Sequence, residues 1–66
     1  MRNMCESSVF LEERGEIRHI MKDVSRIVMD ADDATCIDVV GEQMTLQNVR
    51  LKEANLLSRG IVFARI

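Results

Sequence analysis

The chain has 66 residues, among them two cysteines and two phenylalanines but neither tryptophan nor tyrosine. A chain this short forms one domain, here residues 1–66, and buries only about 60% of its unfolded surface, which favours further stabilisation by homodimerisation. Two cysteines exclude a disulfide framework, and the formal net charge of −2 argues against a protein that binds nucleic acid mainly by electrostatic attraction.

The first predicted element is a strand over residues 5–12, because three consecutive apolar residues at positions 9–11 are flanked by polar ones. The tripeptide Glu13-Arg14-Gly15 follows this strand. Glycine adopts a positive φ at little cost, so Gly15 predicts a hairpin turn at this point.

The segment from residue 16 to residue 30 supports two interpretations. Its apolar residues recur at intervals that match one face of an amphipathic helix: Ile17, Ile20, Met21, Val24, Ile27 and Val28. The alternative is two short strands, residues 17–21 and 24–30, separated by Lys22 and Asp23, since the run at 27–29 favours a strand. Periodicity alone favours the helix.

The second half of the chain predicts further strands. Residues 31–33 form a polar turn, residues 35–40 a strand rich in β-branched side chains, and residues 43–49 its hairpin partner after a tight turn at Gly41 and Glu42. Residues 51–57 are expected to form one short helical turn that ends at residues 58–60, and residues 61–64 form the last strand. Strands at this regular spacing predict an all-β fold, either a small closed barrel or a sandwich.

The sequence also indicates a compartment. It contains no apolar run long enough to cross a bilayer, and its N-terminus lacks the apolar core of a secretory signal. Free thiols persist in a reducing environment, so we expect the protein in the cytoplasm.

Three side chains are candidates for a metal site. Cys5 is a soft ligand near the chain start, and a symmetric dimer would bring two such thiolates together about its axis. Thiolate and nitrogen ligands in a plane suit Ni(II), and tetrahedral sulfur-rich sets suit Zn(II). Cys5 is equally an ordinary small residue at a strand end, Cys36 is predicted to be a core residue, and His19 is predicted to be structural or exposed unless a dimer axis lies near it.

The other charged residues do not form a recognisable site. The acidic cluster of Asp30, Asp32 and Asp33 lacks the glycine and the terminal glutamate of a calcium loop, so it predicts a solvated turn. The basic residues of the second half are expected to be dispersed over the surface: Arg50, Lys52 and Arg59. No nucleophile–base pair, glycine-rich phosphate loop or carboxylate pair is present, so the sequence predicts a protein that is not an enzyme.

Several short pieces of sequence follow one another in a characteristic order. They are Met4-Cys5 with the apolar run at 9–11, then residues 21–24, 39–42, 51–57 and 59–62. In this order and spacing the chain resembles the CooT family of small nickel-binding proteins, from Met4 to the C-terminus. No single piece is specific, and the resemblance rests on their succession along nearly the whole chain.

The resemblance implies a small SH3-like β-barrel that forms a homodimer, and therefore two strands rather than a helix over residues 16–30. It implies nickel handling for the maturation of a nickel enzyme such as carbon monoxide dehydrogenase. Ni(II) would be bound by the cysteine that follows the initiator methionine, which here matches Cys5, and the neighbouring Met4 is the second candidate metal-site residue. Residues 1–3 precede Met4, so a start at Met1 would displace the terminal amine and leave the thiolate in place.

Two alternatives to nickel handling stay open at this point. Members of the family are also labelled as RNA-binding, so the chain could be a small RNA-binding module, or else a structural interaction domain without a metal. The net acidity and the lack of an aromatic stacking platform count against RNA.

Overall fold

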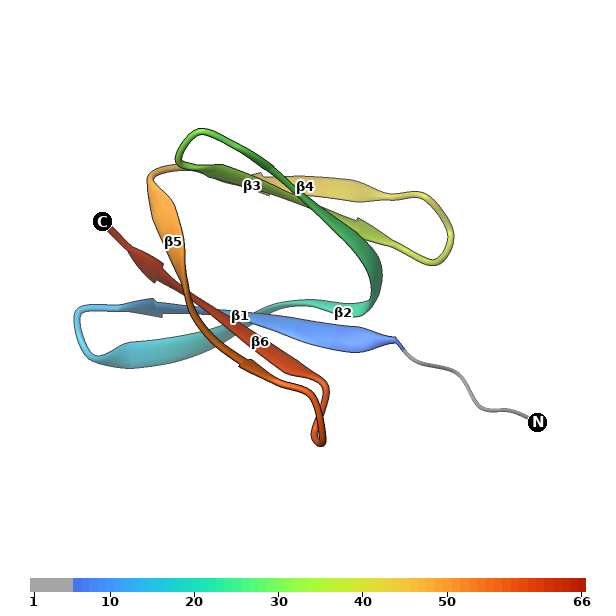
Figure 1. The fold of residues 1–66 in the computed structure, drawn as a ribbon, viewed down its shortest axis with the longest axis horizontal. Helices are drawn as coiled ribbons and strands as arrows, with labels where there is room; N and C mark the ends of the chain where they lie inside the picture. The colour runs from blue at the N-terminus through green and yellow to red at the C-terminus, as the bar shows by residue number, and fades with distance from the viewer. Residues whose placement is uncertain (1–5) are drawn as a thin grey trace.

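The computed structural model describes residues 6–66, and this part of the chain contains six strands and no helix (Figure 1). The strands are β1 (Ser7–Glu13), β2 (Glu16–Asp30), β3 (Asp33–Asp38), β4 (Gln43–Leu46), β5 (Val49–Asn55) and β6 (Gly60–Arg65). The prediction of an all-β fold is therefore confirmed.

All six strands belong to one sheet in the order β4-β3-β2-β1-β6-β5. Neighbouring strands are antiparallel except β1 and β6, which run parallel with Val9 opposite Ile61 and Leu11 opposite Phe63. The first and last strands of residues 6–66 thus pair with each other in the interior of the sheet (Figure 1).

The sheet is not closed, so the prediction of a closed barrel is wrong. Strands β4 and β5 form its two edges and are not hydrogen-bonded to each other. The sheet curls instead, so that the start of β5 reaches the β2–β3 turn, where the Val49 amide donates to the Asp32 carbonyl at 2.8 Å. Whether the architecture is SH3-like stays a prediction.

Strand β2 corrects both interpretations of residues 16–30, since it is one continuous strand rather than a helix or two separate strands. Its first half pairs with β1 and its second half with β3, and the register shifts against each neighbour. The predicted break at Lys22 and Asp23 is one of these irregularities, where Asp23 has a φ of 56°. Each extra residue in a bulge changes the face that the next side chain occupies, so a strand acquires the three- and four-residue spacing of a helix.

The prediction of a helical turn over residues 51–57 is wrong, because strand β5 occupies most of this segment. Leu51 lies opposite Phe63, and Ala54 lies opposite Ile61 on β6. Pairing with a neighbouring strand outweighs the local preference of so short a segment, because a single helical turn is marginal by itself. The turn that follows occupies residues 56–59, and Asn55 orders it by accepting hydrogen bonds from the amides of Leu57 and Ser58 at 3.1 and 3.0 Å.

The start of β4 at Gln43 agrees with the prediction, and the other boundaries of β1, β3, β4 and β6 differ from those predicted by one to three residues. Strand β3 begins at Asp33 and ends at Asp38, so Val39 and Val40 lie in the turn and are exposed. The Asp38 carboxylate orders that turn by accepting from the amides of Val40 and Glu42 at 3.0 and 2.9 Å. Strand β3 therefore ends two residues before Val40, which was its predicted end.

The hydrophobic core lies on one face of the curled sheet and draws on every strand. Its eight buried members are Val9, Leu11, Val24, Ala34, Cys36, Leu46, Val49 and Phe63. Phe63 is the largest fully buried side chain. In a core this small, each member is expected to contribute a large fraction of the stability.

Candidate functional site

The two predicted metal ligands, Cys5 and Met4, lie outside the residues that the structure describes. The described chain enters β1 through Glu6, and the start of β1 lies between the β2 bulge and the β5–β6 turn. Ser7 is opposite Val24, next to the β2 bulge, and the Ser8 amide donates to the carbonyl of Arg59 in the β5–β6 turn at 2.9 Å. The residues that follow Cys5 are therefore held on both sides by neighbouring strands.

A shallow hollow of about 190 Å³ adjoins the start of β1. Its lining residues are Ser7, Val24, Ser25, Arg26, Ile27 and Ile61. The Ser25 hydroxyl is engaged by the neighbouring strand, since it lies 3.3 Å from the carbonyl oxygen of Ile37. The lining contains no thiol, imidazole or carboxylate, so this hollow supplies none of the side chains that bind nickel tightly.

Cys36 lies in the core, as predicted. Its side chain is fully buried on β3, where the residue pairs with Ile27 on one side and Met44 on the other. Burial raises the pKa of the Cys36 thiol. Because a metal ligand must be the thiolate, the same burial that makes Cys36 a core residue makes it a poor ligand.

His19 is exposed on the first half of β2, as predicted. Its ring packs edge-on against Phe10 of β1, with ring centroids 5.3 Å apart and an interplanar angle of 69°. His19 and Cys36 lie on different strands and contribute to no common site. Within residues 6–66, no three His, Cys, Asp or Glu side chains gather in a way that could hold a metal ion.

The acidic cluster surrounds the β2–β3 turn, where Asp30 ends β2, Asp32 lies in the turn and Asp33 begins β3, and the prediction of a solvated turn is confirmed. Asp30 and Asp32 are exposed. The Asp33 carboxylate accepts from the Asn48 amide at 3.3 Å, close to the point where the Asp32 carbonyl accepts from Val49. This turn consequently has a structural role, because it fastens β5 to the β2–β3 hairpin.

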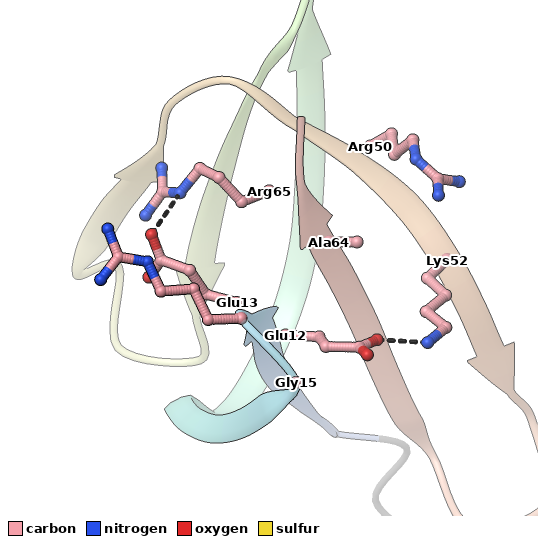
Figure 2. A pocket seen from close by; sticks show the side chains of 8 residues that line it. Glu12, Glu13, Gly15, Arg50, Lys52, Ala64 and Arg65 are labelled. Carbon is pink, nitrogen blue, oxygen red and sulfur yellow. Dashed lines mark hydrogen bonds and ion pairs between the residues drawn. The ribbon is translucent and has the colours of Figure 1, made fainter.

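Two of the basic residues that were expected to be dispersed, Arg50 and Lys52, line one hollow of about 210 Å³ instead (Figure 2). The side chains come from three strands and from the β1–β2 turn, which the sheet register brings together: Arg50 and Lys52 of β5, Ala64 and Arg65 of β6, Glu12 and Glu13 of β1, and Arg14 and Gly15 of the turn. We call this site the arginine hollow. The arginine hollow follows from the strand at residues 49–55, which was predicted as a helical turn. In this strand Arg50 pairs with Ala64, and Ala64 pairs in turn with Glu12.

Ion pairs order part of the arginine hollow. Lys52 pairs with Glu12, and Arg65 lies 3.3 Å from a Glu13 oxygen, as the dashed lines in Figure 2 show. The other Glu13 oxygen lies 3.5 Å from Arg18. Exposed pairs of this kind contribute little stability individually, so their main effect here is to hold the charged side chains in place.

The sequence matches the model of the family described as CO dehydrogenase accessory protein CooT over residues 4–64. The chain belongs to the CooT family. A solved crystal structure of a protein from Carboxydothermus hydrogenoformans, assigned to CooT, has the same fold: the TM-score is 0.83, with 16% sequence identity over 94% of this chain and 98% of that one. No curated protein matches the chain.

Family membership confirms the predicted resemblance. As a CooT protein the chain is an accessory protein of CO dehydrogenase and not itself an enzyme, which implies a role in the maturation of that enzyme. The C. hydrogenoformans structure supports the fold alone, because its sequence identity to this chain is low. Within residues 6–66 no helix is long and apolar enough to span a membrane.

Proposed function

We propose that this CooT protein binds Ni(II) through Cys5 thiolates from the two subunits of a homodimer and supplies the metal to a nickel enzyme such as CO dehydrogenase. Nickel is here the cargo of the protein. The observation that carries the proposal is the family match, which begins at Met4 and so makes Cys5 the second residue of the matched region. The proposed compartment is the cytoplasm, where the thiols stay reduced.

The buried position of Cys36 supports the choice of Cys5. A Cys36 ligand would require both loss of the thiol proton against a raised pKa and opening of the core around a fully buried side chain. His19 supports it less strongly, since its imidazole is exposed but contacts Phe10 rather than another metal-binding side chain. Neither residue offers a set of ligands comparable with two thiolates on a symmetry axis.

The experiment is a titration of the reduced, metal-free protein with Ni(II), followed by near-ultraviolet absorption. The chain contains neither tryptophan nor tyrosine, so sulfur-to-nickel charge-transfer bands are observed against a low background. We expect saturation at about one nickel ion per dimer and an affinity that increases with pH, because binding releases the thiol protons. Sedimentation at micromolar concentration should give the mass of a dimer.

Three variants locate the ligand. Cys5→Ser should abolish the charge-transfer band, whereas Cys36→Ala and His19→Ala should retain both the band and the affinity. Cys36→Ala is the matched control, because it removes the other thiol without placing a hydroxyl in the core. Unchanged nickel affinity in Cys5→Ser, loss of binding in Cys36→Ala, or a stable monomer would each contradict the proposal.

Removal of residues 1–3 tests the contribution of the terminal amine. If the amine or its neighbouring amides bind nickel, a chain that begins at Met4 should bind more tightly than the full chain. Equal affinity would leave the two Cys5 thiolates as the principal ligands.

A further inference from the structure

Charge is distributed unevenly over the described part of the chain. The arginine hollow and the adjoining hollow formed by Glu13, Arg14, Glu16 and Arg18 together contain five of the eight basic residues within 6–66 but only three of the eleven acidic ones. This end of the molecule therefore has a net charge of +2, and the remainder of residues 6–66 has −5. A protein with a net charge of −2 thus presents a localised basic surface.

Two guanidinium groups in the arginine hollow are available to a ligand. Lys52, Arg65 and Arg18 each lie within ion-pair distance of a glutamate. Among the described residues, Arg14 and Arg50 have no carboxylate within that distance. A guanidinium forms two parallel hydrogen bonds with a carboxylate, so each of these two side chains can bind an external carboxylate in that way.

The sheet register explains the form of the hollow. Arg50 lies opposite Ala64, a small and buried residue, so the floor of the hollow is low between the longer side chains on either side. Figure 2 shows Arg50 and Lys52 side by side on β5, with Lys52 directed toward Glu12 and Arg50 outside that pair. Glu12 and Glu13 hold their basic partners in position but leave the total charge of the site positive.

We propose that the arginine hollow is a docking site for carboxylate side chains on the acidic surface of a partner protein. A hollow of about 210 Å³ is large enough for one or two carboxylate groups. No aromatic residue lines it to stack on a base, and the rest of the described surface is acidic, which disfavours RNA. Such a localised charge mainly increases the association rate and orients the partner.

This docking site does not depend on the proposed nickel site. It involves neither Cys5 nor a bound metal, and its test uses the metal-free protein. Failure of nickel binding and failure of docking are therefore separate results.

The probe is a blocked hexaglutamate peptide, titrated into the isotopically labelled full chain at low salt. Two-dimensional NMR follows the arginine Nε–H signals and the backbone amides. We expect the Arg14 and Arg50 signals to move and saturate, and the response to decrease as salt is added. A hexaglutamine peptide of the same length should leave them unchanged.

Two double variants separate position from net charge. Arg14→Gln with Arg50→Gln removes two positive charges from the hollow, and Lys22→Gln with Arg26→Gln removes two from the exposed surface of β2. The Arg14 and Arg50 double variant should weaken hexaglutamate binding about tenfold, because each exposed ion pair contributes about threefold to the affinity. The Lys22 and Arg26 double variant should weaken it much less. If the first variant does not fold, Arg50→Gln by itself should weaken binding about threefold.

Three results would overturn the proposal. They are an equal loss of hexaglutamate binding in the two double variants, movement of the same signals by the neutral peptide, and tighter binding of a hexauridylate RNA or inorganic phosphate than of hexaglutamate. The last result would identify a phosphate site rather than a protein-docking site.

Discussion

Replacement of Cys36 by serine is predicted to destabilise the protein by about 1–3 kcal/mol. Cys36 is fully buried in the core, and β3 is hydrogen-bonded on both sides, to β2 and to β4. Serine has nearly the same shape as cysteine, so the change leaves only a small void. The main cost is a hydroxyl that loses its water and finds the nearby backbone groups engaged in the sheet.

This cost is large relative to the whole stability of the domain. At roughly 0.05–0.15 kcal/mol per residue, a chain of 66 residues has a total stability of about 3–10 kcal/mol. Cys36→Ala provides the comparison, because it removes the sulfur and adds no polar atom. Loss of packing around the shortened side chain should cost only about 1 kcal/mol.

Urea unfolding followed by far-ultraviolet circular dichroism measures both variants, since the chain lacks the tryptophan and tyrosine needed for fluorescence. The serine variant should unfold at a lower urea concentration than the alanine variant. The slope of the free energy of unfolding against urea concentration should be the same for both. If serine is as stable as the parent, the hydroxyl has an acceptor inside the core and the reasoning is refuted.

Two further predictions concern the same thiol and one turn. Burial raises the pKa of the Cys36 thiol above its ordinary value of 9.0, because the core favours the neutral thiol over the thiolate. The stability that the neutral thiol contributes is therefore complete below pH 9.0 and is lost as the pH rises through the raised pKa. In a Cys5→Ser background, urea unfolding between about pH 8 and about pH 10.5 should show a steeper alkaline loss with Cys36 than with Cys36→Ala, and equal slopes would contradict the assignment. Gly15 has a φ of 80°, so Gly15→Ala should cost about 1 kcal/mol, whereas Gly60→Ala should be nearly neutral because its new methyl group would lie 3.5 Å from the nearest neighbouring atom. A greater loss in the Gly60 variant would be evidence against this explanation.

The sequence was sufficient to predict strands where apolar residues form a compact run between turns. Residues 9–11 lie in β1 and residues 61–64 in β6, and the hairpin turn at Gly15 is present with the expected positive φ. The core position of Cys36 followed from its apolar neighbours in the same way. In these cases the local pattern and the tertiary environment agree.

The errors occurred where pairing with distant residues determines the structure. The bulges of β2 depend on the registers of β1 and β3, and no local signal distinguishes them from a helical repeat. The helical turn predicted at residues 51–57 failed because β6 supplies a partner strand there. The same error concealed the arginine hollow, since only a strand at this position places Arg50 and Lys52 beside Glu12.

The arginine hollow lies at the end of β1 that is farther along the chain from Cys5. Ser7 begins the strand next to the segment that contains Cys5, and Glu12 and Glu13 end it at the arginine hollow. At about 3.3 Å per residue, these ends are roughly 20 Å apart. A typical protein interface buries about 800 Å² on each partner, which corresponds to a patch roughly 30 Å across, so one partner can cover both ends of β1. The hollow can therefore orient a partner along β1 toward the start of this strand without supplying a ligand to the metal, and its variants should slow association while leaving nickel affinity unchanged.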